Sequence, residues 1–558
     1  MDADPNPHPT SPPSQATPPA AASSPSASSS LGSAVRSTSL VTLASRFGGL
    51  ARDVLVGIMF GDSALNSAFA TAFSIPNLFR RLFGEGALSA AFIPEYTQGV
   101  KHEPDQADRL ASLTVRWLFI ATGLITTLAI LLLTALLIVL PSDPERQTTI
   151  LLTIVMLPFM PMICIAAILS GMLQVHGKYA AAASGPLILN TFIVVTGLYF
   201  VLTRTTAGET AAYAIAAATT LSGFSQCWWF SRLLKPHARW RSDTDPVKPV
   251  ANRMLKKFFP VLLGTGTLQL NAFMDVAIAS YPLWVGPTIF GYDYPLDEKS
   301  AGIMALASRL YQFPLGVFGI AVASAVFPLL SRTADDKPEF VSVLRRAIRL
   351  SLFIALPATV GLILVRSDAL IAITPKFSPD GQTRAAAVLL GFAPGVWAYS
   401  INHVLTRAFY SRGDTTTALR VSLWFVGINL VLNLTLIWFL RDAGLAWSTS
   451  ICAMLQTVVL AWILRSRLHA DGFPSVFNHE LFIAVVRILA LCAVMGLAVG
   501  LVQYVWSLPE DARWREHVAR LLVCASVGGV IYAIAALALG SREWTWLVGR
   551  SKSKRSSE

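Results

Sequence analysis

Residues 117–140 read WLFIATGLITTLAILLLTALLIVL, an apolar stretch without one charged side chain. An α-helix rises about 1.5 Å per residue, so this stretch is long enough to cross the ~30 Å hydrocarbon core of a bilayer. Similar stretches follow one another along the chain between Pro, Gly or charged breaks. We count fourteen, near 36–60, 64–83 (continuing as a broken helix to 97), 110–140, 148–174, 182–203, 210–233, 254–283, 300–330, 342–366, 384–411, 416–440, 444–466, 480–506 and 516–540. The sequence therefore predicts an all-α polytopic membrane protein.

The composition agrees with this fold class. Of the 558 residues, 54% are hydrophobic and only 14% are charged, whereas an ordinary soluble domain is about 25% charged. A water-soluble enzyme is excluded as the default interpretation. Lys and Arg number 44 against 32 Asp and Glu, a net charge of +12. Such an excess fits nucleic acid, anionic lipid or a phosphorylated substrate, so the positions of the cations must decide.

The cations gather in alternate loops, which sets the orientation. One side holds the clusters near 101–109, 178, 232–257, 332–346, 412, 465–467 and 550–555, and the other holds mostly single cations, Arg146, Arg204, Lys299 and Arg441. The loops near 366–384 and 509–520 are exceptions. We predict that both termini are cytoplasmic and that most of the net charge marks topology, so no nucleic-acid partner is expected.

Short segments recur about 235 residues apart, which suggests a duplication. Residues 87–94 (ALSAAFIP), after Pro76, resemble residues 321–328 (AVASAVFP), after Pro314. An offset of six spans keeps both copies in one orientation and predicts two six-helix lobes as parallel repeats. The predicted divisions are 1–32, a disordered cytoplasmic tail; 33–234, the N-terminal lobe; 235–252, a basic cytoplasmic linker; 253–467, the C-terminal lobe; 468–541, two further helices; and 542–558, a basic cytoplasmic tail.

Ionisable residues inside apolar helices are the informative positions, because each is costly unless it faces a cavity or a partner. The first span contains Arg46, Arg52 and Asp53, the second ends with Arg80, Arg81 and Glu85, and the eighth contains Arg309. A guanidinium stays charged and matches phosphate oxygens bidentately. Snorkelling and ion pairs such as Arg52–Asp53 or Arg81–Glu85 are the structural alternative. Together the arginines predict an anion-binding chamber between the lobes, with Arg46 and Arg52 brought to one cavity by a bend at Gly48–Gly49.

A second polar group falls in the C-terminal lobe. Asp275 lies in the seventh span, and Asn429 and Asn433 are four residues apart on one face of the eleventh. With Thr449 they offer oxygen ligands for a monovalent cation, and interhelical hydrogen bonding is the alternative. The cysteines and histidines form neither a metal site nor a catalytic constellation, so no metal and no cofactor are expected.

Four runs carry a family resemblance: SRFGGLARD (45–53), AFATAFSIPNLFRRLFGEGALSAAFIP (68–94), SRLYQFPLGVFGIA (308–321) and RAFYSRGDT (407–415). They resemble the MurJ (MviN) lipid II flippases of the multidrug/oligosaccharidyl-lipid/polysaccharide exporter superfamily. The resemblance implies a bacterial inner-membrane transporter, with two lobes and a lipid-tail groove made by the last two helices. It implies flipping of undecaprenyl-diphosphate-linked disaccharide-pentapeptide from the cytoplasmic to the periplasmic leaflet for peptidoglycan assembly.

The resemblance also places the family's cavity arginines on Arg46, Arg52, Arg80 and Arg309. The chain departs from the family where acids are common, at Ser67, Ser308 and Gln312, which puts gate salt bridges at those positions in doubt. Implied partners are lipid II, membrane lipids and other cell-wall synthesis and division proteins. The energy source would be a coupling monovalent cation, sodium or proton, or the membrane potential.

Other functions would require other residues. A cation or drug antiporter of the MATE type would favour acidic cavity residues, and a flippase for another lipid-linked oligosaccharide would use different head-group contacts. A polyprenyl-phosphate glycosyltransferase would need paired acids or an acidic metal motif at a membrane face, and the sequence has none. A scaffold without transport would leave cell-wall synthesis unaffected by its depletion.

Overall fold

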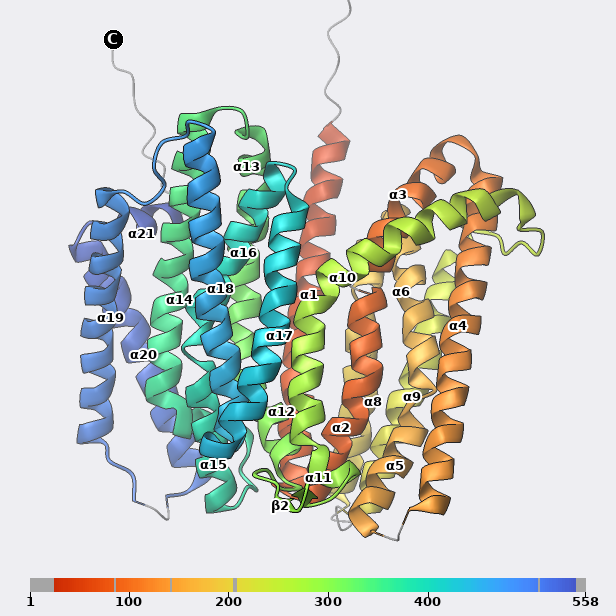
Figure 1. Cartoon of the computed structure of the whole chain (residues 1–558), viewed down its shortest axis with the longest axis horizontal. Coiled ribbons are helices and arrows are strands. Elements are labelled where there is room, and N and C mark those ends of the chain that lie inside the picture. Colours follow the sequence, from red (N-terminus) through yellow and green to blue (C-terminus); the bar gives the residue numbers. More distant parts are fainter. Residues whose placement is uncertain (1–24, 85–86, 141–142, 204–207, 510–511, 548–558) are drawn as a thin grey trace, which may run out of the picture.

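A computed structural model describes residues 25–84, 87–140, 143–203, 208–509 and 512–547 (Figure 1). The structure is helical, and within these residues the only strands are the two-residue pair β1 (Thr288–Ile289) and β2 (Tyr292–Asp293), which form one antiparallel hairpin. Nine described helical segments are long and apolar enough to cross a membrane by length and composition. The all-α polytopic membrane fold predicted from the sequence is confirmed.

Each of the fourteen predicted spans corresponds to one helix or to consecutive helices. The first half comprises α1 (Pro25–Phe60), α2 (Ala64–Phe79), the π-helix η1 (Arg80–Gly84), α3 (Ala87–His102), α4 (Pro104–Val139), α5 (Pro144–Met156), α6 (Phe159–Val175), α7 (Tyr179–Ala182), α8 (Gly185–Leu202) and α9 (Glu209–Leu234). The second comprises the 3₁₀-helix η2 (Asp245–Val247), α10 (Lys248–Ala279), α11 (Tyr281–Trp284), α12 (Ser300–Pro314), the π-helix η3 (Leu315–Gly319), α13 (Ile320–Arg332), α14 (Lys337–Ile373), α15 (Pro379–Phe392), α16 (Gly395–Ser411), α17 (Thr415–Leu440), α18 (Asp442–Ala470), α19 (His479–Val505), α20 (Trp514–Ala538) and α21 (Arg542–Leu547).

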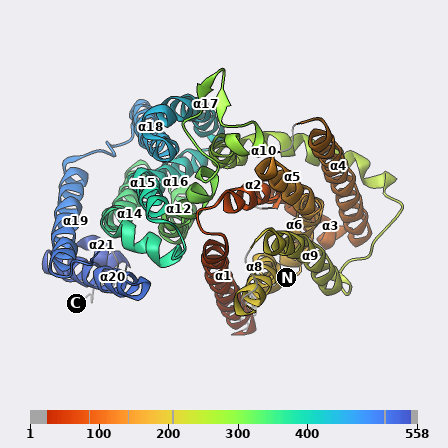
Figure 2. The same ribbon diagram turned by 90° about the horizontal axis from the view of Figure 1, so that it is seen from below.

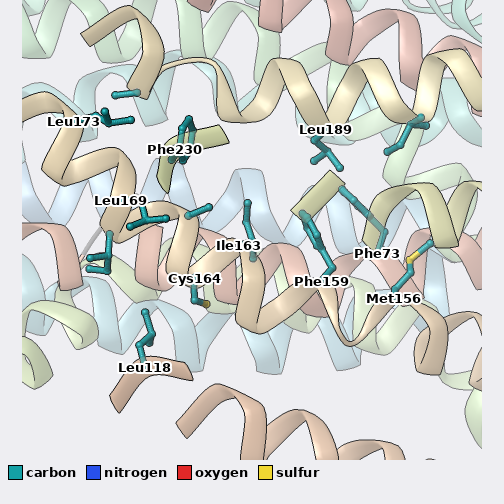
Figure 3. Packing of buried hydrophobic residues seen from close by; sticks show 14 of the residues in the cluster. Phe73, Leu118, Met156, Phe159, Ile163, Cys164, Leu169, Leu173, Leu189 and Phe230 are labelled. Carbon is teal, nitrogen blue, oxygen red and sulfur yellow. The ribbon is translucent and has the colours of Figure 1, made fainter. Parts of the chain in front are cut away.

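The helices form two bundles, seen side by side along the helix axes in Figure 2. We call α1–α9 the N-lobe and α12–α18 the C-lobe. A buried apolar cluster fills the N-lobe, where Phe159, Ile163 and Phe230 bring α6 and α9 together (Figure 3). A second cluster runs from α13 to α20, and α19 and α20 pack against each other and against α14. Each lobe therefore has its own core, and the site between the lobes rests on two separately packed supports.

Helix α10 connects the lobes. It contacts α3 and α4 of the N-lobe and α17 of the C-lobe. The segment before it, which the sequence predicts to be a basic linker, is held on α4 by ion pairs of Arg109 with Asp243 (2.8 Å) and Arg241 with Asp105 (2.5 Å). The two lobes are thus joined by an anchored segment and a shared helix.

The two π-helices fit the proposed duplication. Each follows a helix with an internal proline, Pro76 in α2 and Pro314 in α12, and η1 and η3 begin at Arg80 and Leu315, 235 residues apart. A π-turn widens the backbone locally and frequently marks a functional site. Both π-helices lie next to an arginine of the predicted chamber, as described below.

The hairpin of α17 and α18 holds the polar cluster of the C-lobe and turns within one residue. Arg441 has a positive φ of 50°, and α18 starts at the next residue. The helices then approach so closely that a Cβ on Gly444 would lie 2.5 Å from the carbonyl oxygen of Leu436. A side chain at this position would push the two helices apart.

We predict that Gly444→Ala lowers the stability of the chain by about 1–3 kcal/mol, the usual range for overpacking against backbone. Gly427→Ala, in the same helical hairpin but with no atom within 4 Å of the added Cβ, should be neutral or stabilising by up to ~1 kcal/mol. Thermal unfolding in detergent measures both. Equal unfolding temperatures for the two variants would contradict the close approach at Gly444.

Candidate functional site

One carboxylate joins arginines from both lobes. Asp53 on α1 accepts hydrogen bonds from its neighbour Arg52, at 3.0 Å from Nε and 2.7 Å from Nη2, through Oδ1. Its other oxygen, Oδ2, lies 3.2 Å from Nε of Arg309 on α12. The side chains of Arg52 and Asp53 are only 12% and 14% exposed. Two cations that the sequence separates by more than two hundred positions therefore lie next to one anion.

The N-lobe fixes the orientation of Arg52. Its Nη1 donates to Oδ1 of Asn190 on α8 (3.2 Å), and its guanidinium lies 5.3 Å from the ring centre of Phe73 on α2. Asn190 in turn donates to the carbonyl of Ser45, one turn before Gly49. Asn190 therefore ties α8 to α1 and holds Arg52 at once, a role that sequence reasoning missed because a neutral amide gives no charge signal.

Arg80 and Arg81 start the π-helix η1. Nε of Arg80 donates to Oδ1 of Asn77 (3.1 Å), and Nη1 of Arg81 donates to Oε1 of Gln269 on α10 (2.9 Å). Glu85, the predicted partner of Arg81, lies outside the described residues. The contact with Gln269 makes η1 a second point where an arginine reaches across to a helix of the chain's second half.

Arg46 takes a different position from Arg52. Helix α1 is one uninterrupted helix through Gly48 and Gly49, and Arg46 donates from Nη2 to the carbonyl of Gly316 in η3 (3.3 Å). The larger chamber described next is lined on α1 by Thr42, Ser45, Gly49 and Arg52 but not by Arg46. The predicted convergence of Arg46 and Arg52 on one cavity is therefore not what the structure shows, since Arg46 contacts the other lobe at η3.

Two adjoining cavities meet at the arginines. A cavity of about 140 Å³ lies between α1, α2, α10 and α12, and one of about 590 Å³, which we call the N-lobe chamber, extends among α1, α2 and α6–α9. Both are lined by Arg52, Arg81 and Arg309, and Arg80 lines the chamber. Among the described lining residues four arginines face two carboxylates, Asp53 and Asp275. This excess suits a multiply charged anion, because weakly solvated guanidinium groups bind phosphate oxygens strongly.

The four residues of the predicted cation site do come together. Asp275 is buried and accepts from Nδ2 of Asn433 (2.6 Å) and from Oγ1 of Thr449 (3.2 Å), while Asn433 also donates to Asn429 (3.2 Å). Ser448, which sequence reasoning missed, donates to Oδ1 of Asn433. The interhelical hydrogen bonds of the structural alternative are thus present, and Asp275 also lines the smaller cavity beside the arginines.

Neutral and charged contacts close one end of the molecule, which we call the tied end. Ser67 on α2 accepts from the backbone N–H of Gly302 on α12 (2.8 Å), so the position where the family often has an acid makes an uncharged contact here. Asp62 accepts from the N–H (2.9 Å) and hydroxyl (2.5 Å) of Ser378, the N-cap of α15, and lies 3.6 Å from Lys299. The carboxylate of the N-lobe thereby holds the N-cap residue of a C-lobe helix.

The other two departures lie near Arg309. The hydroxyl of Ser308 donates to the carbonyl of Ala305 within α12 (2.9 Å). Ser308 and Gln312 both line the smaller cavity. Without the acids common in the family, these positions add no negative charge beside Arg309.

Comparison with known proteins identifies the family. The family model of the lipid II flippase MurJ matches residues 56–538. The chain belongs to the MurJ family. Probable lipid II flippases MurJ of Rickettsia prowazekii and Vibrio cholerae are each 27% identical to the chain, over 84% and 90% of its length and 89% and 95% of theirs.

Two solved structures share the fold. A lipid II flippase MurJ in an inward closed conformation matches with a TM-score of 0.71 at 21% identity, covering 90% of this chain and 98% of the other. An inward-facing multidrug resistance MATE family transporter of the MOP superfamily matches with a TM-score of 0.63 at 14% identity, covering 77% and 98%. The chain therefore has the fold that these two kinds of transporter share.

We predict that Asp62→Asn weakens the tied end. Burial alone would raise the pKa of Asp62, but the hydrogen bonds from Ser378 and the charge of Lys299 outweigh it and hold the pKa below its usual range. A lowered pKa means that the ionised contact stabilises the structure above pH ~4 and that this contribution is lost as the pH falls further. The variant should be about 1–3 kcal/mol less stable at pH 7.

The measurement is thermal unfolding in detergent at about pH 7 and about pH 3, on either side of the carboxyl titration, with Asp293→Asn, an exposed acid at the same end, as the control. The Asp62 variant and the unmodified chain should converge at the acidic pH. A difference that persists there, or an equal effect of Asp293→Asn at neutral pH, would contradict a stabilising contact of ionised Asp62.

Proposed function

We propose that the chain moves lipid II across the bacterial inner membrane, from the cytoplasmic to the periplasmic leaflet, and binds its diphosphate with the arginines between the lobes. Family membership supports the substrate, and the arginine excess at the junction of the two cavities carries the proposal. A diphosphate offers several oxygens, which suits a site where guanidinium groups converge from α1, η1 and α12.

The proposed orientation follows the loop charges. With the basic loops in the cytoplasm, the tied end faces the periplasm and both termini lie in the cytoplasm. The contacts of Asp62 and Ser67 then close the periplasmic side, while the N-lobe chamber extends from Arg52 toward Thr42 and Gln174 near the cytoplasmic helix ends. In this state the arginines would accept substrate from the cytoplasmic leaflet.

The movement would be an alternation of the two lobes around the bound head group. In the absence of substrate, Asp53 bridges Arg52 and Arg309, and a diphosphate would compete with it for the same two cations. A ligand shifts a conformational equilibrium only by its differential affinity for the two states. A diphosphate that contacts both lobes would bind the two lobe arrangements with different affinities. Because this transport needs no covalent step, we propose a transporter and not an enzyme.

The polyprenyl tail would stay in apolar surroundings. A cavity of about 590 Å³ with an almost wholly apolar wall lies among α14, α16, α18 and the start of α19, lined by residues such as Leu352, Ile401 and Phe482. We propose this groove, beside the appended helices α19 and α20, as a resting place for the tail. Other cell-wall synthesis and division proteins are proposed partners on the family's account alone.

The polar cluster around Asp275 is our proposal for the coupling site. Carboxylate, amide and hydroxyl oxygens are hard ligands of the type that bind alkali cations, and the cluster borders the cavity that holds Asp53 and Arg309. A monovalent cation here, sodium or a proton, would act on the arginine site through their shared cavity. The membrane potential is the alternative energy source.

The arginines give the first test. Replacing Arg52 or Arg309 by Ala should abolish the ability to rescue a flippase-depleted bacterial strain, because each charged hydrogen bond to the diphosphate contributes roughly 1.5–3 kcal/mol, or about 10- to 100-fold in affinity. Arg46→Ala should do so by removing the contact of α1 with Gly316 of the other lobe. Protein levels in the membrane serve as the readout of folding, and Arg420→Ala, an exposed position on α17, is the matched control. Full rescue by all three variants would reject the proposed function.

The cation site is tested on purified chain. Sodium at about 10 to 100 times its Kd should stabilise the protein by about 1.4–2.7 kcal/mol relative to potassium, and Asp275→Ala and Asp275→Asn should lose this effect while Asp293→Asn keeps it. Thermal unfolding in matched sodium and potassium buffers provides the measurement. No difference between the salts, or an unchanged difference in the Asp275 variants, would exclude sodium as the ligand.

A further inference from the structure

The N-lobe chamber is charged at one end only. Among its described lining residues the charged ones are Arg52, Arg80, Arg81 and Arg309, all near the junction with the smaller cavity. Away from that junction the polar wall is neutral and includes Ser170, Gln174 and Gln226. A ligand that fills this chamber must therefore be anionic at one end and uncharged but polar at the other.

Gln226 on α9 is the distinctive group of the neutral end. Its side chain is buried, with 1% of the residue exposed, and its Nε2 has no hydrogen-bond partner. Of the described residues that line the chamber, no other has a buried side-chain nitrogen or oxygen without a partner. Because an unsatisfied buried amide costs about 1–3 kcal/mol, such a group points to a partner that arrives from the chamber.

The neighbouring polar groups already have protein partners. Asn190 is engaged with Arg52 and Ser45, and the hydroxyl of Ser170 donates to the carbonyl of Ala182. Gln174 also lines the neutral wall, but it is exposed to solvent, so Gln226 is the buried amide of this wall whose donor has no partner.

The backbone leaves room for this amide. Helix α8 begins with Gly185, where a Cβ would lie 2.9 Å from Oε1 of Gln226. Small residues, Ala166 and Ala167 on α6 and Ala182 on α7, form the adjacent wall. The resulting volume of about 590 Å³ falls in the ~300–1,000 Å³ range of small-molecule sites.

We propose that the neutral end of the chamber is a subsite for the amide- and hydroxyl-bearing sugar that follows the diphosphate, with Gln226 donating to a sugar oxygen. This inference rests on the proposed function. A sugar attached directly to the diphosphate reaches the neutral wall while the phosphates stay at the arginines. The peptide is a poorer occupant, because its carboxylates would need cations that the described neutral wall does not provide.

The test uses the full chain in lipid nanodiscs and three probes: undecaprenyl diphosphate, undecaprenyl diphosphate carrying the disaccharide without peptide and with its lactyl carboxyl capped as an uncharged amide, and complete lipid II. Gln226→Leu should weaken binding of the two sugar-bearing probes about 10-fold, the loss expected for one buried hydrogen bond, and change binding of undecaprenyl diphosphate by less than about 2-fold. Gly185→Ala, which displaces the same amide, should show the same selectivity. Gln456→Leu, on α18 and outside the chamber, should change none of the three affinities.

Different results would reject the sugar subsite and the proposed function. Unchanged affinities in Gln226→Leu, equal weakening of all three probes, or weakening of complete lipid II alone would each overturn the sugar subsite. If Gln226→Leu unfolds at a clearly lower temperature than the unmodified chain, its loss of binding reflects a loss of folding. In that case the affinities of Gly185→Ala decide whether the sugar subsite exists. If the unmodified chain binds none of the three probes, the proposed function itself fails.

Discussion

A cluster of charges at the junction of two helix bundles is the constraint on which this structure depends. Arg52 and Arg309 come from different lobes, and both lie against the single carboxylate of Asp53, which leaves one positive charge uncompensated among the three. The three side chains are only 12–28% exposed, so removing the shared carboxylate leaves two guanidinium groups side by side with little solvent to compensate them. The lobes therefore cannot separate at this level unless another anion replaces Asp53 or water enters. A substrate that carries a diphosphate meets that requirement.

The surrounding structure serves this arrangement. Each lobe has its own apolar core, so a lobe can move as a body while the contacts between lobes change. Polar contacts between the lobes include Ser67 with Gly302, Asp62 with Ser378, and Arg46 with Gly316, beside an apolar contact of Val54 on α1 with the cluster of the C-lobe. A rearrangement of the lobes would exchange these contacts and leave the two separate cores packed as they are.

The sequence predicts the features that follow from one-dimensional rules. Bilayer thickness sets the length of each span, and the expense of charge in hydrocarbon singles out Arg52, Asp53 and Arg309 by their positions within apolar stretches. The cluster around Asp275 follows from the same rule together with the i, i+4 spacing of Asn429 and Asn433. The predicted domain boundaries and the roles of the site residues stay predictions.

What the sequence did not predict depends on packing across the chain. Asn190, Gln226 and Ser448 are neutral, and only their neighbours in space give them a role. Arg46 reaches η3 because α1 continues as one helix, and it contacts the carbonyl of Gly316, a residue that has no side chain to block the approach. No local sequence pattern predicts this contact. Glu85 lies outside the described residues, so its predicted pairing with Arg81 stays a prediction.

The central claim, that a diphosphate takes over the arginines shared by the two lobes and frees the tied end, has a direct measurement. Spin labels at Leu202 and Phe439, exposed helix ends of the N-lobe and the C-lobe at the tied end, report their separation by pulsed electron paramagnetic resonance in nanodiscs. Saturating lipid II should populate a longer distance in the otherwise unmodified chain and leave the Arg52→Ala variant unchanged. A distance distribution that lipid II does not alter, or alters equally in the variant, would contradict the account.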